Sequence, residues 1–269
     1  MPPGRTTRAA IFALPADVPS VGMPRLVILF ARSPRREARA KGFSGPEGAE
    51  LFAAFAAGWG AAARRAGARL AISTPPEDLA DWRRLSGIGE AGAAPFFFVQ
   101  RGRRFGDRLE DAARRAGEGS GNAVLVGGDV APSDALLREA FEALENGADA
   151  VGAPASDGGV SLLALSDRDL ELLSALVARR RDVCARLLAA LATRGRRVHL
   201  LRHARDVDGR SDVRRLARPE RFECLDPSLT VLARRALEGA RISRVPVELP
   251  LPHPTCRFGP GLRAPPRAA

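Results

Sequence analysis

Four aspartates stand shortly after three apolar segments of the chain. They are Asp129, Asp157 and the pair Asp206 and Asp208. Ligands of open α/β sheets bind beyond the carboxyl ends of the strands, so we expect these carboxylates to converge on one cleft. Carboxylate oxygens, together with substrate phosphates, are ligands that suit Mg²⁺ and Mn²⁺. The pattern therefore predicts a divalent-metal site, although each aspartate taken alone is more ordinarily a turn or helix-cap residue.

Two glycine pairs accompany these aspartates. Gly127 and Gly128 directly precede Asp129, and Gly158 and Gly159 directly follow Asp157. Glycine lets a backbone approach a ligand closely, and it also supplies the positive φ angles of tight turns. The pairs are therefore compatible either with ligand-contacting strand ends or with two plain turns.

Apolar segments of strand length alternate with segments of helical periodicity along most of the chain. This alternation predicts βαβ units, hence an α/β protein with a mainly parallel sheet, and a hairpin around Gly158 makes that sheet partly mixed. We expect strands at 25–30, 69–73, 95–100, 123–126, 148–152, 160–165 and 197–201. We expect helices at 77–85, 105–116, 169–178, 182–193 and 210–216, and others beginning at Ser44 and Ser133.

The first loop and the helix after it carry distinct local signals. Residues 31–43 are polar and rich in arginine, which predicts a loop. Ser44, Pro46 and Glu47 then form the pattern of a capping box, with Ser44 as the N-cap. We expect this helix to end at Gly67.

The chain divides into one large domain and two extensions. We expect 1–22 to be poorly ordered, 23–218 to form a single α/β domain and 219–269 to be a C-terminal extension. Within that extension the sequence predicts a helix at 229–237, an edge strand at 242–249 and disorder in the proline- and arginine-rich residues 250–269.

The chain is strongly basic, with a formal charge of +11 and a pI near 11.2. Lys41 is the only lysine among 42 lysine and arginine residues, and tyrosine is absent, as in proteins from GC-rich coding sequences. The arginines are scattered in twos and threes over polar helix faces, which favours solvated surfaces over an anion-binding surface. Aromatic residues make up only 5%, which argues against single-stranded nucleic acid as a partner.

The cysteines and the apolar runs of the chain bear on where the protein is located in the cell. Cys184, Cys224 and Cys256 lie far apart, which argues against a disulfide framework or a zinc site. No apolar run approaches the roughly 18 residues that cross a bilayer. We therefore expect a cytoplasmic protein with no membrane partner and leave its oligomeric state open.

Five segments, in order, resemble a known family. The sequence is similar to the bacterial GT-A-type transferases called radical-SAM/selenodomain-associated transferase 1, of which it would be a divergent member. The matching segments span about 23–216 and are 29–34 (LFARSP), 106–113 (GDRLEDAA), 125–131 (LVGGDVA), 152–165 (GAPASDGGVSLLAL) and 205–216 (RDVDGRSDVRRL). The fourth segment is the most specific of them.

The resemblance implies a three-layer nucleotide-diphosphosugar transferase (GT-A-like) fold and metal-assisted transfer of a sugar from a nucleotide-diphosphosugar to a small-molecule acceptor. By position, Asp129 would hold Mg²⁺ or Mn²⁺, and Asp157 would act as the general base. Asp208, Gly158 and Gly159 would lie on the acceptor side. The donor phosphates would be held by Arg32, Lys41, Arg108, Gly127 and Gly128.

Departures from the family leave two alternatives open. The family's first loop usually reads PxPGxVKTRL, whereas here Glu37 replaces the glycine, Lys41 stands one residue late and Gly42 replaces the arginine. An acid in a phosphate loop is unfavourable, so the chain is alternatively a catalytically degenerate homologue with a regulatory or partner-binding role. The second alternative is a nucleotidyltransferase, since enzymes of that class share this fold.

Overall fold

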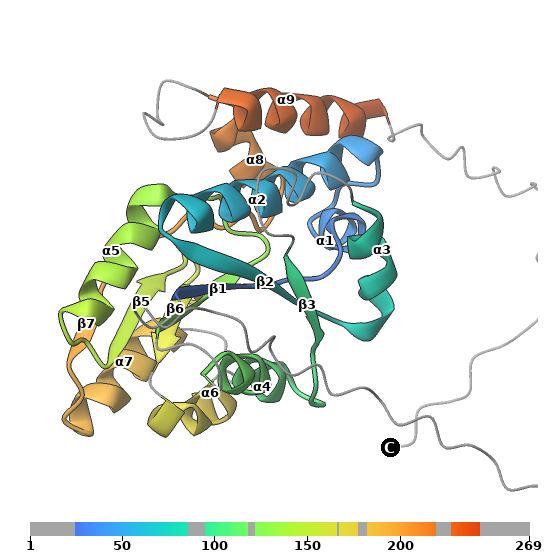
Figure 1. Ribbon diagram of the computed structural model, residues 1–269. Helices are drawn as coiled ribbons and strands as arrows, with labels where there is room; N and C mark the ends of the chain where they lie inside the picture. The colour runs from blue at the N-terminus through green and yellow to red at the C-terminus, as the bar shows by residue number, and fades with distance from the viewer. Residues whose placement is uncertain are drawn as a thin grey trace, which may run out of the picture.

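The computed structural model describes residues 25–85, 95–117, 122–165, 167–176, 182–218 and 227–242. Within them, a seven-stranded sheet in the order β3-β2-β1-β4-β6-β5-β7 forms the centre of the molecule (Figure 1). All neighbouring strands are parallel except β6, which runs antiparallel to both β4 and β5. The strands are β1 (Arg25–Phe30), β2 (Ala68–Thr74), β3 (Phe96–Val99), β4 (Asn122–Gly127), β5 (Ala150–Pro154), β6 (Val160–Leu165) and β7 (Val198–Leu200).

Helices cover both faces of the sheet, which confirms the predicted three-layer α/β architecture. Figure 1 shows α2 and α5 on one face and α4, α6 and α7 on the other. The helices are α1 (Pro34–Ala40), α2 (Pro46–Arg65), α3 (Leu79–Arg84), α4 (Phe105–Gly117), α5 (Asp134–Glu145), α6 (Glu171–Leu176), α7 (Val183–Thr193), α8 (Arg210–Leu216) and α9 (Pro227–Ile242), with short 3₁₀ turns at Pro76–Asp78 and Asp167–Asp169. No helix in the described ranges is long and apolar enough to cross a membrane.

Strand β1 shows why the sheet lies between two helical layers. Val27 and Leu29 are buried in the cluster that contains α2 and α5, while Leu26 and Ile28 are buried in the cluster that contains α4, α6 and α7. Successive side chains of a strand point to opposite faces, so an uninterrupted apolar run fills both cores.

The sheet reverses its winding between β1 and β4. The chain passes from β1 to β2 and β3 on one side, and β4 lies on the other side of β1. A crevice forms beyond the carboxyl ends of the strands at such a switch point, and ligands of open α/β sheets bind there. We therefore expect a ligand to bind at the loops that follow β1 and β4.

The predicted loop at 31–43 is wrong, because Pro34–Ala40 form helix α1. This helix ends in a Schellman motif: Gly42 has φ +85°, and the N–H groups of Gly42 and Phe43 donate to the carbonyls of Arg39 and Ala38. Phe43 is buried beside Ala38 in a third apolar cluster, which fixes the end of the helix. A glycine at position 42 is therefore explained by the local turn that ends α1, and Lys41 is the C-cap residue of that helix.

The start of α2 also differs from the prediction. The N-cap is Gly45 rather than Ser44, and the side chain of the cap makes no hydrogen bond. Pro46 occupies the first turn, where its missing N–H is harmless. The predicted helix is correct, and its start moves by one residue.

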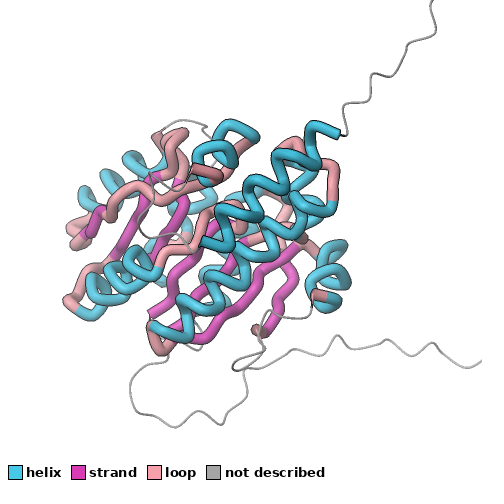
Figure 2. Tube along the Cα trace, turned by 90° about the horizontal axis from the view of Figure 1, so that it is seen from above, coloured by secondary structure: helices cyan, strands magenta, loops and turns pink. Residues whose placement is uncertain are grey.

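The helix predicted at 229–237 is confirmed and longer, as α9. Figures 1 and 2 show α9 lying alongside α2, and its buried residues Leu229, Ala233 and Ala236 share the third apolar cluster with Phe52. The predicted edge strand at 242–249 is wrong at Ile242, which ends α9, and the rest of it lies outside the described residues. Residues 1–22 and 250–269, predicted to be disordered, also lie outside them.

Candidate functional site

A cavity of about 810 Å³ opens beyond the carboxyl ends of β1 and β4. The switch point of the sheet places it there, since the loops that follow these strands form its walls. Most residues predicted to act at the site contribute to its lining, namely Arg32, Arg108, Gly127, Gly128, Asp129, Asp157, Gly159 and Asp208. Two predicted residues are not part of the lining: Lys41, which bonds two of the lining side chains, and Gly158.

Asp129 and Asp208 lie close together because hydrogen bonds join the backbone segments that carry them. Val130 and Asp206 form an isolated antiparallel bridge. The N–H of Val207 donates to the carbonyl of Asp129 at 2.9 Å, and Val207 is buried in the third apolar cluster. Two segments distant in sequence are thereby held side by side with their carboxylates at the cavity.

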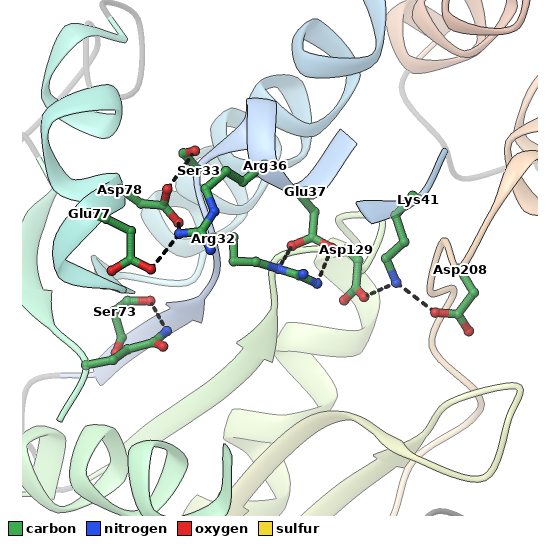
Figure 3. Close-up of polar contacts among 11 residues, drawn as sticks. Arg32, Ser33, Arg36, Glu37, Lys41, Ser73, Glu77, Asp78, Asp129 and Asp208 are labelled. Carbon is green, nitrogen blue, oxygen red and sulfur yellow. Dashed lines mark hydrogen bonds and ion pairs between the residues drawn. The ribbon is translucent and has the colours of Figure 1, made fainter. Parts of the chain in front are cut away.

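The side chain of Lys41 links these two aspartates, as Figure 3 shows. Its Nζ lies 2.7 Å from Asp129 Oδ2 and 2.7 Å from Asp208 Oδ1, and the lysine side chain is only 10% exposed. Burial lowers the pKa of Lys41, but the two carboxylates raise it by more, so its net pKa lies above the usual range. The ammonium therefore stays charged at neutral pH, and it offsets the repulsion between the two acids.

The turn that carries Asp208 is fixed by a third acid. The Asp212 Oδ2 atom accepts hydrogen bonds of 3.0 Å from the backbone N–H groups of both Asp208 and Gly209. Both N–H groups directly precede the first turn of α8, and Asp212 in that turn caps them with its side chain. Asp212 thus holds the backbone of Asp208 in place and leaves the side chain of Asp208 to Lys41.

The acid at position 37 is tolerated because it pairs with Arg32. Its carboxylate accepts from Arg32 Nε at 2.9 Å and from Arg32 Nη2 at 3.1 Å. Burial, with a further contribution from Asp129, raises the pKa of Glu37, while Arg32 and Lys41 oppose that rise. Glu37 therefore partly neutralises Arg32 at the cavity wall, which reduces the charge that Arg32 offers to a phosphate.

A second arginine of this region, in α1, is also engaged by acids. Arg36 Nη1 lies 2.7 Å from Glu77 Oε1 and 3.2 Å from Asp78 Oδ2, and Ser33 Oγ donates to Asp78 Oδ1 at 3.0 Å (Figure 3). Asp78 is buried, and its two partners belong to the loop and helix after β1. This network fixes α1 against the 3₁₀ turn Pro76–Asp78.

Arg108 differs from the arginines of the first loop. It projects from α4 into the cavity lining, and its Nε is buried with no hydrogen-bond partner among the described residues. A guanidinium carries five N–H donors in a planar fork that suits oxyanions. Arg32 is paired with the carboxylate of Glu37, whereas Arg108 has no such pair among the described residues.

Two further acids, Asp157 and Asp206, line the cavity. Asp157 is exposed, and its Oδ1 accepts from the N–H of Gly159 at 2.8 Å. Asp206 Oδ1 accepts from Ser156 Oγ at 3.1 Å and from Ser156 N at 3.3 Å. Burial raises the pKa of Asp206, and the bonds from Ser156 only partly oppose this.

The glycines have structural reasons of their own. A Cβ on Gly128 would lie 2.4 Å from the Cβ of Ala31, so this glycine is required by the close approach of the loops after β1 and β4. Gly158 has φ +89° and lies in the turn of the β5–β6 hairpin. The confirmed hairpin therefore accounts for Gly158 as a turn residue.

The arrangement does not fit a divalent cation shared by Asp129 Oδ2 and Asp208 Oδ1. Lys41 Nζ occupies the space between Asp129 Oδ2 and Asp208 Oδ1, where a cation shared by the two carboxylates would sit. No cluster of three or more His, Cys, Asp or Glu side chains suited to a metal ion occurs in the part of the chain that the structure describes. A cation shared by Asp129 Oδ2 and Asp208 Oδ1 would need Lys41 to leave both of its partners.

Sequence reasoning missed Arg36, Glu37 and Glu77 as members of the cavity lining. Glu37 was visible only as a departure from the family pattern, and no local signal pairs it with Arg32. Asp206 was among the acids expected at the cleft, but no separate role was predicted for it. Its burial and its bonds to Ser156, 50 residues away, depend on the tertiary fold.

Comparison with known proteins supports the fold. Residues 59–177 match the family described as an uncharacterized protein conserved in bacteria (DUF2064). This match spans less than half of the chain, and it contains Asp129 and Asp157 but neither Lys41 nor Asp208. The chain matches no curated protein.

The solved structure of a candidate nucleotide-diphospho-sugar transferase from Desulfovibrio desulfuricans G20 is similar over 81% of this chain and 97% of its own, with a TM-score of 0.66 and 22% identity. The chain therefore has the nucleotide-diphospho-sugar transferase fold.

Two more distant structures are also similar. A candidate glucose-1-phosphate thymidylyltransferase from Bacillus anthracis, solved with sucrose, covers 79% of this chain and 96% of its own at 14% identity and a TM-score of 0.49. Rv0371c of Mycobacterium tuberculosis H37Rv, solved with manganese, covers 72% and 98% at 18% identity and a TM-score of 0.44.

Proposed function

We propose that this protein is a transferase that takes a nucleotide-diphosphosugar as donor and passes the sugar to a small-molecule acceptor. The observation that carries the proposal is the convergence of Arg108, Asp129, Asp157 and Asp208 on one cavity at the switch point of this fold. Lys41 is bonded to two of these acids. The sequence resemblance to radical-SAM/selenodomain-associated transferase 1 agrees with it, and membership of that subfamily stays a prediction.

The cavity suits a ligand of this size and charge. Small-molecule sites usually enclose about 300–1,000 Å³, and this cavity holds about 810 Å³. Its lining contains both arginines and aspartates, which suits a ligand with a phosphate end and a hydroxyl-rich end. A cavity of this kind favours a nucleotide-sugar over a nucleic-acid strand.

The basic part of the lining would bind the donor diphosphate. Arg108 has a buried Nε without a partner among the described residues, and Arg32 lines the same cavity with its charge reduced by Glu37. Guanidinium groups stabilise the charge that develops on a departing nucleoside diphosphate, because oriented donors in a cleft need no reorganisation during the reaction. Gly127 and Gly128 would bring the backbone after β4 close to the same phosphates.

The acidic part of the lining would bind the acceptor. In this proposal Asp157 takes the proton from an acceptor hydroxyl while the hydroxyl oxygen attacks the anomeric carbon of the sugar, and the bond from that carbon to the diphosphate breaks. The N–H of Gly159 orients the Asp157 carboxylate. Asp208 and Gly158 would shape the acceptor side. The chemistry needs no metal ion between Asp129 and Asp208, because Lys41 holds that position.

The experiment is a binding and turnover panel. UDP-, GDP-, ADP- and TDP-sugars and the matching triphosphates are tested by thermal shift, with release of nucleoside diphosphate or pyrophosphate as the chemical readout. A transferase is stabilised by one diphosphosugar and releases its nucleoside diphosphate. Pyrophosphate release from a triphosphate would indicate a nucleotidyltransferase, and no response to any nucleotide would indicate the degenerate homologue.

Two matched variants locate the activity in the cavity. Asp157→Asn removes the proposed base and is expected to lower the rate at least about 100-fold with donor binding retained. Asp134→Asn changes an exposed aspartate outside the cavity lining and is expected to leave the rate unchanged. Equal rates for the two variants would refute the role of Asp157.

A further inference from the structure

The ammonium of Lys41 has the geometry of a fixed cation in the site. It is bonded at 2.7 Å to carboxylates from two different loops, and its side chain is nearly buried. An ammonium has three N–H donors. Two of them are taken by Asp129 and Asp208, and the third has no protein partner among the described residues.

The amino-acid usage of the chain sets this lysine apart. Every other basic residue among the 42 lysine and arginine residues is an arginine, so arginine is the residue that this sequence uses wherever only positive charge is needed. Arginine carries a planar fork, whereas lysine carries a compact point charge that fits between two separate oxygens. The one lysine stands where a compact cation is required.

The surrounding structure holds Lys41 rigidly in this place. The Schellman motif at Gly42 and Phe43 fixes its backbone at the end of α1. The bridge between Val130 and Asp206 fixes the two segments that carry its partners. Lys41 is 10% exposed, whereas its partner Asp208 is 51% exposed, so the lysine is the more enclosed member of the pair.

We propose that Lys41 takes the place of the divalent cation, so that this protein binds its nucleotide-diphosphosugar without a metal. The ammonium neutralises Asp129 and Asp208 from within the protein. Binding of the donor without a metal rests on the proposed function, whereas the exclusion of a metal by Lys41 does not.

The first test measures Mn²⁺ binding directly, by electron paramagnetic resonance of the free ion during titration, and needs no substrate. The wild-type protein is expected to bind no Mn²⁺ at up to about tenfold molar excess. Lys41→Met removes the charge and frees both carboxylates, so we expect it to bind one Mn²⁺. The double variant Lys41→Met with Asp129→Asn is expected to lose that ion again.

Controls keep this test decisive. Lys41→Arg retains the positive charge and is expected to bind no Mn²⁺. Far-ultraviolet circular dichroism checks that the variants fold. If a variant does not fold, the titration of the wild-type protein with Mn²⁺ still tests the inference. Stoichiometric binding of Mn²⁺ by the wild-type protein, abolished by Asp129→Asn, would overturn the inference.

The second test uses the diphosphosugar that the panel selects. Its dissociation constant, measured by calorimetry, is expected to agree within about twofold in excess EDTA and in Mn²⁺. Binding that appears only with Mn²⁺ would overturn the inference and leave the proposed function standing. No binding in either buffer would refute the proposed function, and the Mn²⁺ titration would still decide the role of Lys41.

Discussion

Trp59 donates its indole N–H to the carbonyl oxygen of Val130 at 2.8 Å, in the buried core. This bond joins the middle of α2 to the residue directly after Asp129. Val130 also makes the bridge to Asp206, so one tryptophan supports the loop that places both carboxylates next to Lys41. The candidate site is therefore connected to the interior of the domain through a polar contact of α2.

Replacing Trp59 with phenylalanine tests that contact. The variant leaves the Val130 carbonyl buried without its donor, so we expect the free energy of unfolding to fall by about 1–3 kcal/mol beyond the effect of lost volume. Urea unfolding monitored by circular dichroism measures the change.

Trp82 provides the control, since it is buried but its Nε1 has no hydrogen-bond partner among the described residues. Trp82→Phe removes similar volume without removing a bond, and a loss as large as that of Trp59→Phe would argue against the role of the Val130 contact.

Gly42 is expected to resist substitution for conformational reasons alone. Its φ is +85°, and no atom lies within 4 Å of the position that a Cβ would take, so Gly42→Ala meets backbone strain and no clash. We expect the free energy of unfolding to fall by roughly 1–2 kcal/mol. Gly209 also has open space at its Cβ position, but its φ is −176°, and Gly209→Ala should be tolerated. Equal losses in denaturant unfolding would contradict the Schellman assignment.

Glu37 predicts a pH dependence of stability. Burial raises its folded pKa above the ordinary value of 4.5, so the folded state binds the proton more tightly than the unfolded state. The stability that Glu37 contributes is present below pH 4.5 and is lost as pH rises through the folded pKa. We therefore expect the stability of Glu37→Gln relative to wild type to increase as pH rises above 4.5. Urea unfolding between about pH 4 and pH 8 measures this difference.

Glu77 is expected to change stability with pH in the opposite direction to Glu37, so it serves as the reference. A backbone hydrogen bond, followed by the bond from Arg36, lowers the pKa of Glu77, so its contribution is present above pH 4.5 and is lost as pH falls. The stability of Glu77→Gln relative to wild type should therefore fall as pH rises toward 4.5. A flat or falling difference for Glu37→Gln would show that Arg32 outweighs the burial of Glu37.

Arg108 is expected to dominate donor binding among the arginines of the cavity. Arg108→Ala removes charge-assisted hydrogen bonds to the diphosphate, so we expect the dissociation constant of the diphosphosugar to rise about tenfold or more. Arg103 is exposed and outside the lining, and Arg103→Ala should leave the constant unchanged. Calorimetry measures both. An equal effect of the two variants would indicate a diffuse electrostatic attraction in place of a specific contact.

The sequence predicts the sheet better than it predicts the first loop. Strands such as β1 are buried on both faces, so their apolar runs are visible without any knowledge of the fold. Helix α1 buries only Pro34, Glu37 and Ala38, and its sequence has no apolar period. It is held by the ion pair of Glu37 with Arg32 and by the Schellman motif.

The same distinction applies to the candidate site. The aspartates follow strands, and the geometry of parallel sheets brings strand ends together, so their meeting at one cavity could be predicted. The partners of Lys41 could not, because they lie 88 and 167 residues away along the chain. Only the packed structure shows that the ammonium stands between them, and with it the conflict with a bound metal.

The bridge between Val130 and Asp206 has a consequence for assembly of the protein. Lys41, Asp129 and Asp208 come from three separate segments of the chain, and Lys41 and Asp208 are 167 residues apart. The bridge holds the segments of the two aspartates next to each other. Contacts of such long sequence separation cost more loop-closure entropy than local contacts, which slows their formation. A nascent chain that has not yet been synthesised past Asp208 therefore lacks the second carboxylate that holds Lys41.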